Sequence, residues 1–212
     1  MMQPMNPAWF DRLCIARTRE HYAWLSHLPS PVSTIANFGC WSGAEPFALM
    51  WTLNARELVV IEIEAEYLTT LADEIERIRR MQPDSLADRI IRPLCRNMCI
   101  RIRDLPDDAF DLAFCENVLY TLPLQERSAD VAAAIHQMIR VVKPDGFVVA
   151  VEPKFGAIFE TRRFDLAGIP IAISIPVSDP EDMSTWFASD SLERIRVADA
   201  PHYAFCYQKI HR

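Results

Sequence analysis

No run of lysine or arginine forms a basic cluster in the 212 residues, and the formal net charge is −7. Proteins that bind nucleic acid need positive charge to neutralise phosphates, so this composition argues against a nucleic-acid partner. An acidic surface is easier to reconcile with small neutral or cationic substrates, or with a protein partner. We therefore expect a small-molecule substrate.

Long apolar segments are also missing, because no stretch approaches the roughly 20 residues that a membrane-spanning helix needs. The first seven residues lack the basic segment followed by an apolar stretch that marks a secretory signal. These absences predict a cytoplasmic protein without a membrane span.

Metal-ligand spacing is absent as well. The six cysteines are scattered, which favours reduced and mostly buried thiols. Cys95 and Cys99 lie close together, but no second Cys or His pair accompanies them. The five histidines form no pair at ligand spacing either. We expect no metal site.

The sequence does contain alternating helical and strand patterns. Apolar residues at helical spacing predict helices over residues 7–27, 44–53, 66–81 and 125–142. Short apolar stretches predict strands over residues 32–38, 58–63, 89–94, 110–115 and 147–151. The run Lys143-Pro144-Asp145-Gly146 ends the last of these helices. Strands that alternate with helices indicate βαβ units around a parallel sheet.

The tail departs from that alternation. Residues 192–197 and 204–210 have strand patterns, and the short stretch 198–203 between them cannot hold a parallel crossover. The two strands must therefore be antiparallel. We expect an α/β fold, Rossmann-like and doubly wound, with a mainly parallel seven-stranded sheet that ends in an antiparallel hairpin and an N-terminal helix.

A glycine-containing turn links the first predicted strand to the following helix. Gly39 allows a sharp turn off the strand, and Gly43 allows the helix to approach closely. Ser42 and Glu45 have the spacing of a helix capping box. Glu62 ends the second strand, where its carboxylate could accept hydrogen bonds from a ribose diol. Together these features predict a nucleotide-binding half-unit.

Four segments carry a more specific combined signature: the glycine turn at 37–43, the strand end at 61–68, residues 105–120, and residues 139–146. In this order and spacing they resemble the motifs of the class I S-adenosylmethionine-dependent methyltransferases. The resemblance covers about residues 30–155.

This resemblance implies S-adenosylmethionine as the cofactor and S-adenosylhomocysteine as the product. The turn from Gly39 to Gly43 would pass under the methionine part, Glu62 would hold the ribose, and Ile63 would lie against the adenine. A polar residue in the loop after the third strand would face the adenine amino group, and the segment after the fourth strand would line the cleft near the sulfonium. The complete implied set is Asn37, Gly39, Cys40, Trp41, Gly43, Glu62, Ile63, Asn97, Met98, Glu116, Asn117 and Val118.

Two positions depart from the family pattern. Trp41 replaces the middle glycine of the motif, and Asn37 replaces an acid. An indole that points away from the cofactor could pack over the mouth of the cleft, whereas one that points inward would block it. Asn37 keeps a hydrogen-bonding side chain but lacks the charge that would complement the ammonium group of the cofactor.

We expect a single methyltransferase domain. Its parts are an N-terminal helical cap (1–30), a cofactor-binding core (31–153), a substrate or lid insertion (154–191) and a C-terminal antiparallel hairpin (192–212). Within the insertion, residues 169–177 alternate like a strand, and two prolines confine that strand to an edge or an irregular ribbon. Its apolar side would cover a hydrophobic substrate, or pack against the domain or a homodimer partner.

The expected reaction is in-line methyl transfer to an O, N or C atom of a small molecule. The protein has mainly to align the reacting atoms, and a base is needed only for a protonated nucleophile. Candidates for that base are Glu116, Tyr120 and Glu152. Two alternatives are a non-catalytic or cofactor-binding scaffold on the same fold, and a nicotinamide-dependent oxidoreductase. The oxidoreductase fingerprint Gly-x-Gly-x-x-Gly is not matched at positions 39, 41 and 44.

Overall fold

The computed structural model describes residues 19–40, 44–119, 128–152, 163–166, 169–172, 187, 189–201 and 204–211. One large sheet contains seven strands: β1 (Thr34–Phe38), β2 (Glu57–Glu62), β3 (Ile90–Cys95), β4 (Phe110–Glu116), β5 (Val142–Val151), β8 (Leu192–Arg194) and β9 (Ala204–Lys209). The remaining elements are η2 (Ala23–His27), α2 (Ala44–Thr52), α3 (Ala65–Met81), η3 (Pro83–Ser85), α4 (Ser128–Val141), β6 (Arg163–Leu166) and β7 (Ile169–Ala172).

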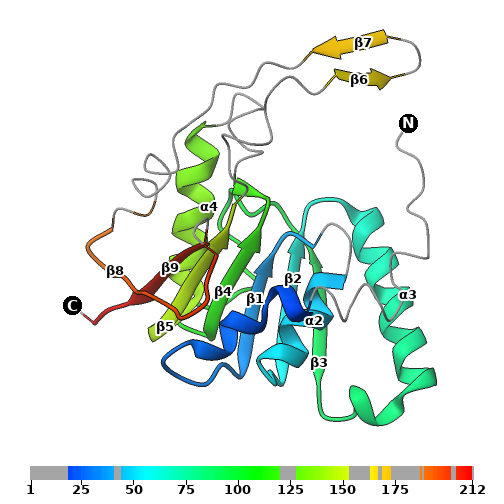
Figure 1. Cartoon of the computed structure of the whole chain (residues 1–212), viewed down its shortest axis with the longest axis horizontal. Coiled ribbons are helices and arrows are strands. Elements are labelled where there is room, and N and C mark those ends of the chain that lie inside the picture. Colours follow the sequence, from blue (N-terminus) through cyan, green and yellow to red (C-terminus); the bar gives the residue numbers. More distant parts are fainter. Residues whose placement is uncertain are drawn as a thin grey trace.

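The order of the strands confirms the predicted fold class. It runs β3-β2-β1-β4-β5-β9-β8 (Figure 1). The first five strands are parallel to their neighbours, whereas β9 is antiparallel to both β5 and β8. The molecule is thus a doubly wound α/β protein whose mainly parallel sheet ends in an antiparallel hairpin.

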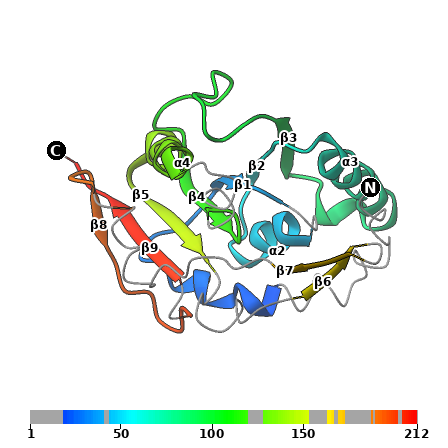
Figure 2. The same cartoon turned by 90° about the horizontal axis from the view of Figure 1, so that it is seen from above.

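Alternate residues of the central strands enter two apolar clusters, one on each face of the sheet. Residues of η2, α2 and α3 pack on one face, and residues of α4 with the segment 98–105 pack on the other. Figure 2 shows α2 and α4 on opposite sides of the sheet. Because both faces are covered, β1, β2 and β4 are buried along almost their whole length.

Strand β5 starts earlier than its sequence predicts. Val142 already pairs with Phe110, and the register then shifts before Leu112 pairs with Phe147. A Cβ atom added to Gly146 would lie 2.7 Å from Cγ1 of Val142, so the chain folds tightly here. The Pro-Asp-Gly segment ends α4 as predicted, but it forms an irregularity within the strand and not a turn in front of it.

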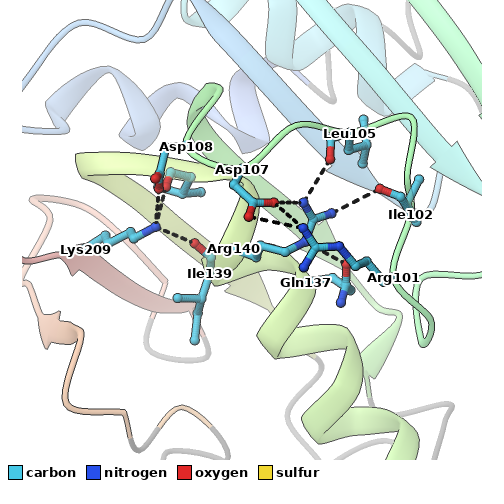
Figure 3. A network of polar contacts seen from close by, with 10 residues as sticks. Arg101, Ile102, Leu105, Asp107, Asp108, Gln137, Ile139, Arg140 and Lys209 are labelled. Carbon is cyan, nitrogen blue, oxygen red and sulfur yellow. Dashed lines mark hydrogen bonds and ion pairs between the residues drawn. The ribbon is translucent and has the colours of Figure 1, made fainter.

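A buried arginine fixes the loop that enters β4 (Figure 3). The guanidinium of Arg140, near the end of α4, donates hydrogen bonds to the backbone carbonyls of Leu105 (2.8 Å) and Ile102 (3.2 Å), and it pairs with Asp107. Its Nε donates to Gln137 at 3.0 Å. These contacts hold the amino-terminal edge of the sheet, away from the carboxyl ends of the strands.

Several predicted segments lie partly or wholly outside the described residues. The N-terminal helix is described only from residue 19, where it is helical to His21 and continues as η2. Of the alternating segment 169–177, the first four residues form β7, which pairs with β6 in a separate two-stranded ribbon. The ring of Phe187 stacks on Tyr207 of β9 at 4.9 Å between centroids. None of the described helices is long and apolar enough to cross a membrane.

Candidate functional site

The candidate site lies where the strand order of the sheet reverses, between β1 and β4. Strand β1 is in the middle, the chain continues through β2 and β3 on one side, and it then crosses to β4 and β5 on the other. In doubly wound folds the loops at the carboxyl ends of such strands separate and leave a crevice for a ligand. Asn37 is the next-to-last residue of β1, and Glu62 and Glu116 are the last residues of β2 and β4.

Gly39 brings the turn after β1 into contact with the turn after β4. Its φ is +87°, and an added Cβ atom would lie 2.5 Å from Cγ2 of Val118. The Gly39 amide donates to the carbonyl of Ile61 at 2.7 Å, and the Asn117 amide donates to that of Val151 at 2.9 Å. Only glycine tolerates both this backbone conformation and this close approach. This geometry is consistent with the sharp turn that the sequence predicts at Gly39.

Glu62 is held at the tip of β2 by backbone amides. One carboxylate oxygen accepts a hydrogen bond from the Cys40 amide at 3.1 Å, and the other accepts from Ile63 (2.7 Å) and Glu64 (3.1 Å). The carboxylate therefore spans from β2 to the turn after β1. Ile63, next to it, exposes 53% of its surface although it is a large apolar residue. An anchored acid beside an exposed apolar side chain suits a ribose with its attached base.

The loop after β3 carries the two residues expected near the adenine. The side-chain oxygen of Asn97 accepts from the Cys99 amide at 2.8 Å. This contact holds the carboxamide of Asn97 in the loop after β3. Met98 is only 9% exposed and packs in the cluster on the α4 side of the sheet. Both roles stay predictions, with less exposed surface available at Met98 than at Ile63.

A polar network that the sequence did not predict lies at the ends of β1 and β4. The hydroxyl of Tyr22 donates to Glu116 and lies 3.4 Å from Oε2 of Glu45. The other carboxylate oxygen of Glu45 accepts from the amide nitrogen of Asn37 at 2.6 Å, and His21 lies 3.0 Å from Glu116. The spacing of Glu45 suggested only a helix cap, and no sequence signal links the N-terminal segment to β4.

This network changes the acidity of its members. Burial, followed by the nearby charge of Glu116, holds the pKa of Glu45 well above its ordinary value. Burial and the charges of Glu45 and Glu116 likewise raise the pKa of Tyr22. The hydrogen bond to Glu116 raises the pKa of His21, although partial burial opposes it. Ionisable groups with perturbed pKa values that gather at one place are a feature of functional sites.

The other candidates for a general base differ in their surroundings. Glu152 is 1% exposed at the end of β5, and its carboxylate accepts a hydrogen bond from the Leu119 amide at 3.0 Å. It orders the turn after β4, and this enclosed position does not favour proton exchange with a substrate. Glu116 is more accessible, with 15% of its side chain exposed. Tyr120, Trp41 and Gly43 lie outside the described residues.

A separate hollow of about 830 Å³ lies beside the carboxyl ends of α2 and α3. It is lined by Trp51, Arg77, Ile78 and Met81 among others, and it contains none of the residues at the strand ends. In the described part of the chain no group of three or more His, Cys, Asp or Glu side chains could hold a metal ion.

The residues at the switch point fit S-adenosylmethionine. The close turn at Gly39 offers a backbone surface, the anchored carboxylate of Glu62 can accept ribose hydroxyls, and Ile63 presents an apolar surface. In addition, the side-chain oxygen of Asn37 is buried and accepts no hydrogen bond from the described residues. A ligand that donates hydrogen bonds would satisfy it.

Comparisons with known proteins agree with this assignment. A family model described as a methyltransferase domain matches residues 36–150. No curated protein sequence matches the chain significantly.

Solved structures share the fold at low sequence identity. The N-methyltransferase NodS from Bradyrhizobium japonicum, in complex with S-adenosylhomocysteine, is 16% identical, with 95% of this chain and 90% of that one covered and a TM-score of 0.55. The sugar N-methyltransferase KedS8 from Streptoalloteichus is 11% identical, with coverage of 100% and 95% and a TM-score of 0.66. The amino pentose methyltransferase CalS10 from Micromonospora echinaspora is 14% identical, with coverage of 92% and 89% and a TM-score of 0.60.

The family model covers more than half of the chain, from β1 to β5. The protein therefore belongs to the class I S-adenosylmethionine-dependent methyltransferases.

Proposed function

We propose that the protein transfers the methyl group of S-adenosylmethionine to a small molecule bound over the carboxyl ends of β1 and β4. The observation that carries this proposal is the contact between Glu62 and the Cys40 amide, at 3.1 Å, which joins the acid of β2 to the turn after β1. Those are the two elements that must act on one nucleoside.

Each of the residues at the strand ends has a separate task in this proposal. Glu62 binds the ribose hydroxyls, Ile63 covers one face of the adenine, and the turn at Gly39 supports the amino-acid end. Bound S-adenosylmethionine supplies a methyl group on a positively charged sulfur. The chain has to hold the acceptor in line with that methyl group, which is an effect of orientation.

A nitrogen acceptor is the form of this reaction that we favour. The solved structures named above include a sugar N-methyltransferase and an amino pentose methyltransferase, which are enzymes of small molecules. In this chain, Glu116 lies at the end of β4 with part of its side chain exposed, and it contacts His21. A carboxylate backed by an exposed imidazole suits the removal of a proton from an ammonium group before it reacts.

A thermal-shift experiment tests the proposal. We expect S-adenosylmethionine and S-adenosylhomocysteine to raise the melting temperature. At a hundredfold excess over Kd, binding adds about 2.7 kcal/mol to the free energy of unfolding. NAD and NADP should have no effect. Stabilisation by NAD alone would support an oxidoreductase, and no stabilisation by any of the four would support a scaffold.

A further inference from the structure

The hollow beside the carboxyl ends of α2 and α3 is separate from the candidate site at the strand ends. Helices that follow parallel strands run back toward the amino edge of the sheet, so these helix ends lie opposite the strand ends that carry Glu62 and Glu116. The hollow has a volume of about 830 Å³. Pockets that hold small organic molecules measure roughly 300–1,000 Å³, so this one is large enough for such a ligand.

Part of the lining is apolar and open to solvent. Trp51, near the end of α2, and Ile78 and Met81, in the last turn of α3, line the hollow. Met81 exposes 57% of its surface although it is a large apolar residue. An indole and a thioether both make favourable contacts with aromatic rings. A flat apolar ligand would remove this surface from water.

Two arginines reach the same hollow from different elements. Arg77 of α3 is held in place, since its Nε donates to Oε2 of the buried Glu74 at 2.8 Å and its Nη1 donates to Sδ of Met81 at 3.2 Å. A thioether is a weak acceptor, so an anionic oxygen would be a better partner for this Nη1. Arg19 makes no ion pair with the described residues. Glu20 is the one acid among the described lining residues, so cations outnumber acids there.

A hydroxyl without a partner also lines the hollow. The Oγ1 atom of Thr52 is buried and makes no hydrogen bond with the described residues. Leaving a buried hydroxyl without a partner is unfavourable. This observation is independent of the volume and of the arginines, and it also points to a ligand that brings a polar atom.

The N-terminal side of the hollow is a built wall. Arg19, Ala23 and Ser26 follow one another at about one helical turn and line the hollow. Between them, Tyr22 and Leu25 are buried in the apolar cluster that includes residues of α2 and α3. The wall is thus fixed by packing on its other face, as expected of a binding pocket that is formed before its ligand arrives.

We propose that this hollow is a second binding site, which takes a small aromatic anion. Its rings would contact Trp51 and Met81, and its anionic group would pair with the guanidinium groups of Arg77 and Arg19. The inference does not depend on methyl transfer, because the hollow shares no residue with the strand ends at which the cofactor is proposed to bind.

Two fluorescent probes separate the contribution of the charge from that of the rings. 1-Anilinonaphthalene-8-sulfonate is an aromatic anion, and N-phenyl-1-naphthylamine has the same rings without the sulfonate. Both become brighter in an apolar site. We expect the full chain to bind one equivalent of each, with the anion bound about fivefold more tightly because of its charged hydrogen bonds. Trp51→Ala should weaken both probes by about fivefold, because each loses the same ring contact.

Substitution of the arginines tests the charged contact. Arg77 is replaced together with Glu74, because losing Arg77 alone would leave a buried carboxylate without this partner. The double variant Glu74→Gln, Arg77→Gln should weaken the sulfonate probe by about tenfold and leave the uncharged probe within about twofold of the wild type. Arg19→Gln should weaken the sulfonate probe by about threefold.

Arg79→Gln is the matched control. Arg79 is in the same part of α3, pairs with Glu76 at 2.8 Å, and is not one of the described residues that line the hollow. Its substitution should change the affinity for neither probe. An excess of S-adenosylhomocysteine should displace neither probe from the wild type.

Four results would overturn the inference. They are no saturable binding of the sulfonate probe, equal weakening of both probes by the double variant, probe binding that Trp51→Ala leaves unchanged, and displacement by S-adenosylhomocysteine. A chain that binds the probes as expected but does not bind S-adenosylhomocysteine would refute the proposed function and support the second site.

Discussion

Nε2 of His21 lies 3.0 Å from Oε1 of Glu116, which joins the N-terminal segment to the end of β4 across 95 positions of the sequence. The contact places an ionisable ring beside the candidate site. It is partly open to solvent, since 40% of the His21 side chain is exposed.

This contact predicts a pH-dependent contribution to stability. The hydrogen bond to Glu116 raises the pKa of His21 above its ordinary 6.5, so the contribution is complete below pH 6.5 and is lost as pH rises through the raised pKa. Solvent screening keeps it below about 1 kcal/mol. We expect His21→Gln to lower the free energy of unfolding in urea at about pH 6 and to have little effect at about pH 9. An equal effect at both pH values would contradict the role of the charge.

For Glu45 we predict that substitution has the opposite effect on stability. Its pKa is raised above the ordinary 4.5, so folding is favoured below pH 4.5 and this stability is lost as pH rises through the raised pKa. Glu45→Gln removes the loss. At about pH 8 we expect a gain of about 1 kcal/mol, or roughly 2–4 °C in melting temperature, without ligand. A lower melting temperature than wild type at that pH would exclude a protonation penalty at Glu45.

Glu62→Ala tests the ribose contact. The variant should weaken S-adenosylhomocysteine binding by on the order of 1.5–3 kcal/mol, because a charged hydrogen-bond acceptor is lost. Glu64→Ala is the control, since Glu64 is exposed and its side chain makes no capping hydrogen bond to α3. Isothermal calorimetry measures both affinities. An unchanged affinity in Glu62→Ala would remove this residue from the site.

Gly39→Ala tests the close packing of the two turns. A left-handed backbone costs a residue with a Cβ atom roughly 1–2 kcal/mol, and the contact with Val118 adds to this. Adding Val118→Ala should recover only the contact, because the substitution leaves the φ of +87° unchanged. Urea unfolding of the single and double variants measures the two parts. A double variant as stable as Val118→Ala alone would show that backbone strain is negligible.

Arg140→Met tests the network of Figure 3. The substitution removes hydrogen bonds from the carbonyls of Ile102 and Leu105, and we expect a loss of about 2–4 kcal/mol in unfolding free energy. Arg101 pairs with the same Asp107 but exposes 64% of its side chain. Arg101→Met should therefore cost much less, by roughly 0–1 kcal/mol. Similar losses for the two variants would contradict the importance of burial.

The sequence predicts elements whose signal is local. The apolar stretches that become β1, β2 and β4 are found within two residues of their ends, because both faces of these strands are buried. The start of β5 at Val142 is not predicted, since it depends on pairing with Phe110 through an irregular register. Proline and glycine chemistry indicates the end of a helix, but it does not say which strand receives the segment that follows.

The candidate site likewise contains residues with a local sequence signal and contacts without one. The sequence proposes Gly39 and Glu62 as site residues because a turn and a strand end are local features, and their contacts with a cofactor stay predictions. The sequence does not predict the polar network around Glu45, because its partners Tyr22 and Glu116 lie far away in the chain and meet it only in the folded protein. Contacts of this kind have no periodicity and no spacing to recognise.

The placement of β9 has a consequence for how the chain assembles. β9 lies between β5 and β8, although β8 comes earlier in the sequence. Among the described strands, β8 hydrogen-bonds only to β9, so it cannot join the sheet until the later strand has docked. During synthesis β5 therefore presents an open edge, and a nascent chain that stalls before β9 emerges would be vulnerable to pairing with strands of other molecules.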